Sequence, residues 1–320
     1  MNHLHLSLSL IIPCYNEEAL LTLCVERILR QAQELGPRGE IIISVNGSTD
    51  ATLQIAKTLQ SSNPLIRVNS IPEANKKAAM NAGLALASNR YVVFCDADSF
   101  LDDTALLQLK TKITTNRFAI VGAIRRPLVN KSQINTHFLD TYFLLHYAKR
   151  LSLRSKERLS VQGWLMAIDT AQFQTLQFPL DSSADDIWLS AYTWTMHGAG
   201  SIGYIPHAVG TYLIPQTMED LKSQLLRHRS NHKTVKRLHP ELSEYFEARM
   251  AYYGEAFSTT LWRRKAIELG VDFDTWFPEY KSFTDSIDKH IFKGTLAYGV
   301  GVTWERVSST KTLPSEKYIQ

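Results

Sequence analysis

Short apolar runs alternate with amphipathic stretches through the first hundred residues. The apolar runs predict strands, because they are rich in β-branched residues and end at turn residues. These strands cover Leu8 to Pro13, Glu40 to Val45, Ile66 to Ile71 and Tyr91 to Cys95. Helical spacing between them predicts helices over 16–35, 51–59 and 76–87. Strict strand-helix alternation predicts an α/β fold, with a mainly parallel sheet, right-handed crossovers and helices on both faces.

The pattern loosens after Cys95. It predicts helices over 103–115, 135–153 and 185–196, and strands over 118–124, 161–169 and 202–213, the last as one or two strands around Pro206. From Met218 to about Gly270 the spacing is helical, and beyond Gly270 it predicts no regular element. We therefore expect a sheet-based domain over 1–215 and a mostly helical extension over 216–320.

Composition changes this picture little. The chain has 320 residues, of which 44% are apolar and 21% charged, as in ordinary soluble globular proteins. Its three cysteines are too few for a disulfide framework and fit a reducing cytosol. No apolar run approaches the ~18 residues of a spanning helix, and the start lacks the positive region of a signal peptide. We expect a cytoplasmic protein whose only membrane contact would be peripheral, at the inner face.

The net charge of +4 is small but unevenly distributed. Residues 125–158 hold eight Lys or Arg against two acids, and residues 222–237 hold six and no acid. Such stretches attract phosphates of a nucleotide, a lipid headgroup or nucleic acid, or they form solvated helix faces. Because no nucleic-acid module is recognisable, we expect no nucleic-acid partner.

Two carboxylates, Asp96 and Asp98, follow the strand Tyr91 to Cys95. In extended chain they would project to one side and share a divalent cation. Oxygen ligands suit Mg²⁺ or Mn²⁺ rather than zinc. The alternative is that Asp98 and Ser99 start a turn, with Asp102 or Asp103 capping the next helix.

Four further stretches lie near predicted strand ends or sheet edges. They are Ile12 to Glu18, Val45 to Asp50, Asn75 to Gly83 and Ala184 to Leu189. Together with Asp96 and Asp98, their order and spacing over roughly residues 7 to 230 resemble a family-2 glycosyltransferase of the GT-A fold. The resemblance implies transfer of a sugar from a nucleotide-diphosphate sugar to an acceptor hydroxyl, with Mn²⁺ or Mg²⁺ and with inversion of the anomeric carbon.

The resemblance places donor-binding residues at the first two strand ends. Pro13, Tyr15, Asn16 and Glu17 would meet the base or ribose through an aromatic face, an amide and a carboxylate, although Asn16 and Glu17 also suit the start of a helix. The family usually has two acids before the Gly-Ser-Thr-Asp of this stretch, the first of which contacts the base, and here those positions are Val45 and Asn46. That change removes the carboxylate acceptor expected for uracil, while the amide of Asn46 can still bond a base.

Other donor contacts follow from the remaining stretches. Lys76 would contact the diphosphate at a helix N-terminus, unless it only faces water. Asp96 would bind ribose or metal, and Asp98 would ligate the metal directly. The segment Gln224 to Arg229 resembles the family's Gln-x-x-Arg-Trp, with Gln224 and Arg227 kept and His228 in place of Trp. Arg227 and Arg229 would meet the diphosphate or an anionic acceptor. Since processive synthases use that Trp to hold the polymer, the change implies a non-processive enzyme.

The pair Asp185 and Asp186 aligns with the family's Glu-Asp, which makes Asp186 the candidate general base. Adjacent carboxylates repel, which raises one pKa and favours a base near neutrality. The alternative is an acid pair that only complements a helix N-terminus. Gly163 would let backbone approach the sugar, and Trp164 would either stack on a sugar ring or lie in the core.

Two other functions stay open. A nucleotidyltransferase shares a similar sheet and metal, but residues 12–24 lack the Gly-rich phosphate loop it normally carries. The second open function is that of a phosphate-binding or scaffold protein of the same fold without catalytic activity. The sequence leaves open the donor sugar and base, an anionic or lipid-linked acceptor, and whether residues 230–320 form a lid, an acceptor platform or a homodimer contact.

Overall fold

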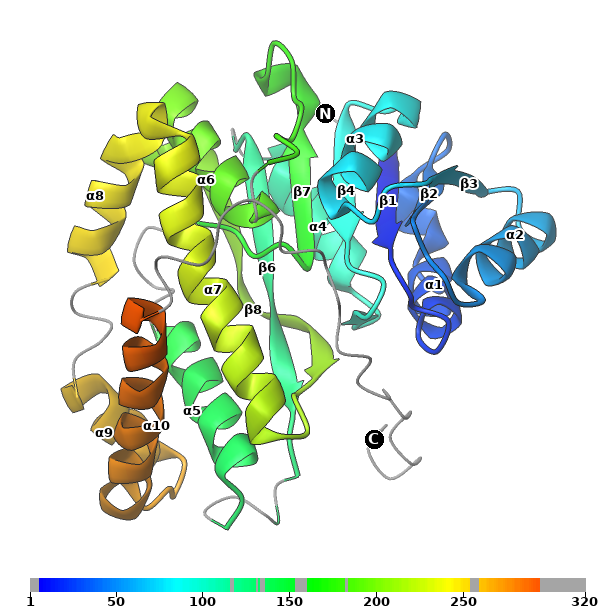
Figure 1. The fold of residues 1–320 in the computed structure, drawn as a ribbon. Helices are drawn as coiled ribbons and strands as arrows, with labels where there is room; N and C mark the ends of the chain where they lie inside the picture. Colours follow the sequence, from blue (N-terminus) through cyan, green and yellow to red (C-terminus); the bar gives the residue numbers. More distant parts are fainter. Residues whose placement is uncertain are drawn as a thin grey trace.

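The structure is a computed structural model that describes residues 6–115, 118–130, 132, 136–152, 160–181, 184–253 and 259–293. In that part of the chain, one sheet of eight strands has the order β3-β2-β1-β4-β7-β6-β8-β5 (Figure 1). The strands are β1 (Leu8–Cys14), β2 (Glu40–Asn46), β3 (Ile66–Ile71), β4 (Tyr91–Cys95), β5 (Phe100–Leu101), β6 (Ile120–Leu128), β7 (Leu165–Asp169) and β8 (Ile202–Leu213).

Strands β1 to β4 run parallel, so their carboxyl ends share one edge of the sheet. Strand β7 is antiparallel to β4, and Leu165 at its start pairs with Cys95 at the end of β4. The residues just before β7 therefore reach the edge where β4 ends.

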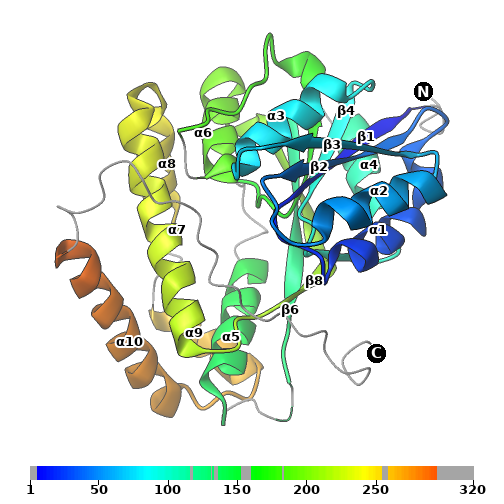
Figure 2. The ribbon, with the colours of Figure 1, turned by 45° about the vertical axis from the view of Figure 1, so that its right-hand side comes forward.

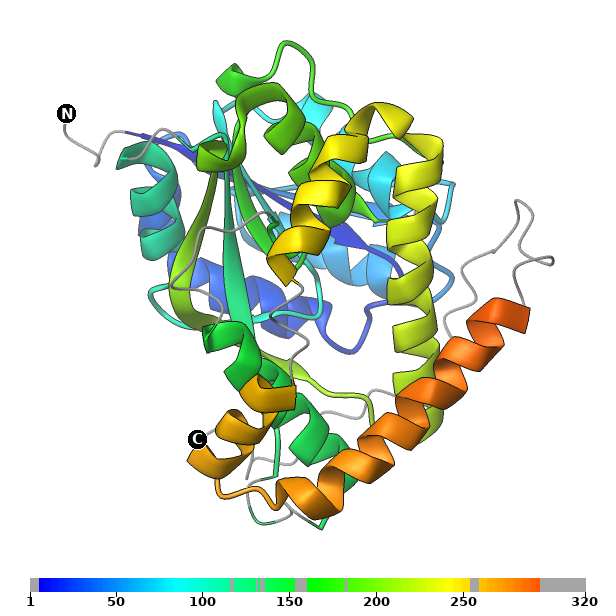
Figure 3. The same cartoon turned by 90° about the vertical axis from the view of Figure 1, so that its left-hand side faces the viewer.

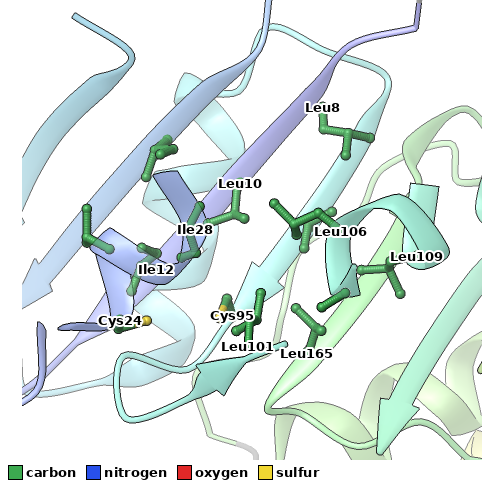
Figure 4. Close-up of a cluster of buried hydrophobic side chains, with 14 of the residues drawn as sticks. Leu8, Leu10, Ile12, Cys24, Ile28, Cys95, Leu101, Leu106, Leu109 and Leu165 are labelled. Carbon is green, nitrogen blue, oxygen red and sulfur yellow. The ribbon is translucent and has the colours of Figure 1, made fainter. Parts of the chain in front are cut away.

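Helices cover both faces of the sheet. On one face lie α1 (Leu21–Leu29), α2 (Thr52–Ser62) and α4 (Ala105–Thr115), and on the other lie α3 (Lys76–Leu86) and α6 (Asp185–His197). Side chains of β1 alternate between the two cores, because Leu10 packs against the first set and Ile11 against the second. Figure 4 shows Leu8, Leu10 and Ile12 pointing toward Ile28 of α1 and toward the leucines of α4. The predicted α/β sheet with helices on both faces is confirmed.

The remaining five helices of the described chain lie beside the sheet, and two of them also pack against α6. They are α5 (Phe138–Ser152), α7 (Met218–Leu238), α8 (Ser243–Tyr253), α9 (Thr259–Glu268) and α10 (Phe273–Lys293). Short helical turns cover Ala32–Leu35, Thr170–Gln172, Ala199–Ser201 and Pro240–Leu242. Figures 2 and 3 show α10 running alongside α7, with α9 next to α5. The expected helical C-terminal region is present, while the boundary at residue 215 stays a prediction.

Two local expectations were wrong, and the choice between one and two strands over 202–213 is decided. Helix α1 begins at Leu21 instead of Asn16, because the intervening loop bonds to the loop after β2. Residues 202–213 form one strand, in which Pro206 lies at a register shift opposite β6. Helix α10 is regular where no element was expected, since buried Phe273 and Trp276 lie one turn apart on it. Within the described residues, no helix combines the length and hydropathy that crossing a membrane requires.

Candidate active site

Lys76 joins two of the predicted acids. Its Nζ lies 2.8 Å from Asp96 Oδ1, just after β4, and 3.1 Å from Asp185 Oδ2 at the start of α6. Burial by itself would lower the pKa of Lys76, but the charges of Asp185 and Asp96 outweigh it, so that the pKa is raised and the ammonium stays charged. The Asn75 side chain accepts hydrogen bonds from the backbone N–H groups of Lys77 and Ala78, which holds the first turn of α3 in place.

The acid pair at the start of α6 packs against Gly163. The Gly163 N–H donates to Asp186 Oδ2 at 3.2 Å. A Cβ atom at position 163 would lie 3.0 Å from Asp185 Oδ2, so only glycine allows this approach without a shift. Burial, and then the charge of Asp185, raise the pKa of Asp186 to about 6, against the opposing effects of Lys76 and the Gly163 N–H. A carboxylate with that pKa is ionised at neutral pH and suited to accept a proton.

The chain turns directly after Asp96. The Asp96 N–H donates to the Trp164 carbonyl at 2.8 Å, and the Ser99 N–H donates to the Asp96 carbonyl at 3.1 Å. The chain at Asp96 and Asp98 is therefore a turn and not the extended chain that was expected, so the alternation of side chains along a strand does not apply to this pair. Each carboxylate has its own cationic neighbour: Lys76 for Asp96, and Arg125, whose Nη1 lies 3.7 Å from Oδ1, for Asp98.

The loops after β1 and β2 bind each other. Asn16 has φ of 52°, a left-handed conformation that asparagine tolerates, and its Oδ1 accepts from the Thr49 N–H at 2.8 Å. The Asn16 N–H donates to Ser48 Oγ, and the Glu17 N–H donates to Thr52 Oγ1 at 2.8 Å. Asn16 thus links the two loops and does not cap α1, whose N-cap residue is Leu20.

The other donor-side residues differ in exposure. Tyr15 is half-buried, Glu17 and Pro13 are buried, and Asn46 at the end of β2 is only 2% exposed. Pro13 pairs with Ser44 inside the sheet. In this arrangement Tyr15 is the one with most surface available for a base.

Trp164 lies in the core, 2% exposed, where its Nε1 donates to the Ala123 carbonyl at 2.8 Å. Of the two roles expected for it, this position corresponds to core packing, since a buried ring has no face free to stack on a sugar. Gln224 is half-buried on α7, and its Oε1 has no hydrogen-bond partner among the described residues. Arg227 and Arg229 also belong to α7, but their side chains lie outside the described part of the chain.

One charged residue beside the site was not predicted as part of it. Arg125 of β6 lies with its guanidinium 4.6 Å from the ring centroid of Tyr212 and 5.8 Å from that of Trp164. The available signal was its place at the start of the first basic stretch, next to a predicted strand. Its approach to Asp98 joins residues 27 apart in sequence, which no local pattern reveals.

With this geometry established, comparison with known proteins gives a direct match. The family model described as Glycosyl transferase family 2 matches residues 9–179, which is more than half of the chain. The chain belongs to glycosyl transferase family 2. The resemblance inferred from the five stretches is confirmed.

Family 2 relatives and a solved structure give the wider context. The poly-beta-1,6-N-acetyl-D-glucosamine synthase of Staphylococcus aureus (strain COL) is 26% identical over 226 residues, which are 69% of this chain and 53% of that protein. The chondroitin synthase of Pasteurella multocida (strain Pm70) is 28% identical over 46% of this chain and 16% of its own length. The chain thus spans about half the length, or less, of these relatives.

One solved structure with a similar fold is a mannosyltransferase of Pyrobaculum calidifontis in complex with GDP-Man and Mn²⁺. It has a TM-score of 0.61 at 18% identity and covers 91% of this chain and 88% of its own. At this identity the match shows the shared fold.

The residues of this family 2 protein suit one kind of metal site. Among the described residues, no group of three or more His, Cys, Asp or Glu side chains could hold a metal by itself. Mg²⁺ and Mn²⁺ sites in nucleotide enzymes often use one or two carboxylates and take their remaining oxygens from phosphates and water. Asp96 and Asp98 can supply the carboxylates, so the residues fit a metal that binds together with a diphosphate.

Proposed function

We propose that this chain transfers a sugar from a nucleotide-diphosphate sugar to an acceptor hydroxyl, with Mn²⁺ or Mg²⁺ and with inversion at the anomeric carbon. The observation that carries the proposal is the contact of Lys76 with both Asp96 and Asp185. Through that ammonium, the groups suited to a departing diphosphate lie next to the acids suited to an incoming hydroxyl. The family match, and a similar fold that binds GDP-Man and Mn²⁺, support the same chemistry.

Each side chain has a role that follows from its charge. Lys76, at the N-terminus of α3, would bind the diphosphate, because its ammonium and the positive end of the helix dipole both favour an anion. Asp98 and Asp96 would hold the divalent cation, which when bound offsets the negative charge that develops on the leaving diphosphate. Asp186 would accept the proton of the acceptor hydroxyl, and Gly163 keeps its carboxylate oriented.

The proposal specifies the acceptor only by its chemical class. His228 in place of the family's tryptophan supports transfer of one or a few sugars instead of processive synthesis. An anionic or lipid-linked acceptor would suit the basic residues of α7, and contact with a membrane surface would follow from it. We also propose that the sheet region up to residue 215 binds the donor and that the helices after it complete the acceptor side.

The test compares three single substitutions by donor binding and turnover. Asp98→Asn should abolish Mn²⁺-dependent binding of a nucleotide-diphosphate sugar. Asp186→Asn should leave donor binding nearly intact and lower turnover at least ~100-fold, because it removes only the base. Exposed Asp103, a carboxylate close in sequence but outside these contacts, is the matched control, and Asp103→Asn should change neither.

Two results would contradict the proposal. Full activity of Asp186→Asn would exclude Asp186 as the base. No transfer and no slow hydrolysis of any donor with Mn²⁺ would favour the catalytically idle protein. A thermal-shift screen of GDP and UDP sugars with and without Mn²⁺ would first identify the donor, since a ligand that binds the folded state raises Tm.

A further inference from the structure

Arg125 is a half-buried cation, with 23% of its side chain exposed. Its Nη1 is inaccessible to solvent and makes no hydrogen bond among the described residues. The nearest carboxylate oxygen, Asp98 Oδ1, lies 3.7 Å away, within range of an ion pair but too far for a hydrogen bond. The arginine therefore interacts with Asp98 by charge rather than by a directed bond.

The surrounding side chains keep the guanidinium near Asp98. Its carbon lies 4.6 Å from the ring centroid of Tyr212 and 5.8 Å from that of Trp164, distances at which a cation is attracted to an aromatic face. Trp164 is itself fixed by its hydrogen bond to the Ala123 carbonyl. Because a guanidinium stays protonated in proteins, this positive charge cannot be removed by deprotonation.

We propose that Arg125 is the counter-ion of Asp98 and makes metal binding depend on the nucleoside diphosphate. The inference rests on the proposed metal site at Asp98. A divalent cation held by that carboxylate would be repelled by the guanidinium, whose stacking on two rings restrains it from moving away. Lys76 opposes a cation at Asp96 in the same way. The negative charges of a diphosphate would offset both repulsions, so metal and nucleotide should each strengthen binding of the other.

The next residue in β6 provides a matched control. Arg126 binds Asp102 instead of Asp98. Its guanidinium makes two hydrogen bonds of 2.8 Å to the Asp102 carboxylate. Arg126→Gln removes the same formal charge from the protein at an adjacent position, without touching the Asp98 ion pair.

The experiment measures Mn²⁺ binding by calorimetry, to the wild type, Arg125→Gln, Arg126→Gln and Asp98→Asn. Each protein is titrated alone and with GDP or UDP, with correction for the association of Mn²⁺ with the free nucleotide. In the absence of nucleotide, we expect Arg125→Gln to bind Mn²⁺ at least ~10-fold tighter than the wild type does. Addition of GDP or UDP should increase the Mn²⁺ affinity of Arg125→Gln less than that of the wild type. Arg126→Gln should behave as the wild type, and Asp98→Asn should lose the site.

The outcomes separate this inference from the proposed function. If Asp98→Asn abolishes Mn²⁺ binding but Arg125→Gln binds Mn²⁺ no tighter than the wild type, the counter-ion role is wrong and the metal site stands. If Asp98→Asn binds Mn²⁺ as the wild type does, the metal site itself is wrong. Arg125→Met, which keeps an unbranched stem beside Tyr212, replaces the glutamine variant if the latter does not fold. Arg125→Lys, which keeps the charge, should retain the weak binding of the wild type.

Discussion

At the scale of single residues, the acid pair of α6 shows how neighbours give two adjacent carboxylates different roles. Asp185 lies 3.1 Å from the Lys76 ammonium, whereas Asp186 accepts a hydrogen bond from the Gly163 N–H. Because burial and the charge of Asp185 disfavour ionisation, the pKa of Asp186 is raised to about 6. The two residues would thus have different roles: Asp185 forms an ion pair with Lys76, and Asp186 accepts the proton of the acceptor hydroxyl.

This division predicts a pH dependence of turnover. Asp186 must be ionised to accept a proton, so kcat should fall about tenfold per pH unit below pH 6 and level off above it. Asp185→Asn removes a charge that raises the pKa of Asp186, and should move the acidic limb to lower pH. The measurement is kcat against pH at saturating donor and Mn²⁺, with Asp103→Asn as the control. An acidic limb that stays in place in Asp185→Asn would show that another group titrates.

At the scale of elements, α3 is tied to the loop that leads into α6. The Asn81 side chain donates to the Phe178 carbonyl and accepts from the Phe178 N–H, both at 2.8 Å. The Phe178 ring is fully buried between Phe94 of β4 and Trp188 of α6, with centroid distances of 5.6 Å to each. The three elements that carry Lys76, Asp96 and Asp186 therefore meet at one buried phenylalanine.

This connection predicts a positioning role for Asn81. Asn81→Ala leaves a backbone N–H and C=O of Phe178 without partners, which should lower the free energy of unfolding by about 2–3 kcal/mol. It should also lower kcat about tenfold with little change in donor affinity, because the loop before Asp186 loosens relative to Lys76. Denaturant unfolding and steady-state kinetics measure the two effects.

Two control substitutions test whether the effect of Asn81→Ala comes from its bonds to Phe178. Asn81→Asp keeps the acceptor for the Phe178 N–H and should fall between the wild type and Asn81→Ala. Thr58→Ala on α2 removes only an exposed hydroxyl bonded to the Gln54 carbonyl, and should alter neither quantity measurably. A change in stability alone for Asn81→Ala would reduce Asn81 to a structural residue.

At the scale of the whole molecule, strand order decides which residues meet. The carboxyl ends of β1, β2 and β4 share one edge, and antiparallel β7 begins at that edge. Gly163 and Asp186 therefore reach the donor-side residues from positions about seventy and ninety residues beyond β4. The helices α5, α9 and α10, with Leu221 of α7, form a further core that includes Tyr142, Trp262 and Trp276.

This helical core predicts an effect on stability from a residue that has no role in the proposed reaction. Trp276 is 6% exposed, and its ring stacks on Tyr280 with centroids 4.9 Å apart and an interplanar angle of 15°. Trp276→Ala should lower the free energy of unfolding by about 3–4 kcal/mol, since it leaves a large cavity. Ile267→Ala, at a side chain that is 72% exposed, is the control and should stay within about 0.5 kcal/mol. Equal effects of the two substitutions would contradict the assignment of Trp276 to a core.

The sequence by itself determined the strand-helix alternation from Leu8 to Cys95 and the identity of the five stretches. These depend on local periodicity and on residue types at chain turns, both of which can be read along the chain. It failed at α10, where an internal proline and mixed polar residues obscured a helix that is stabilised by packing on α9.

Only the tertiary structure decided how the site is assembled. The turn after Asp96, the bridge from Lys76 to Asp185 and the approach of Arg125 to Asp98 join residues up to about a hundred positions apart. Such contacts depend on strand order and direction, which local patterns do not encode. The sequence thus named most of the charged groups of the site, and the fold determined which positive charge lies against which acid.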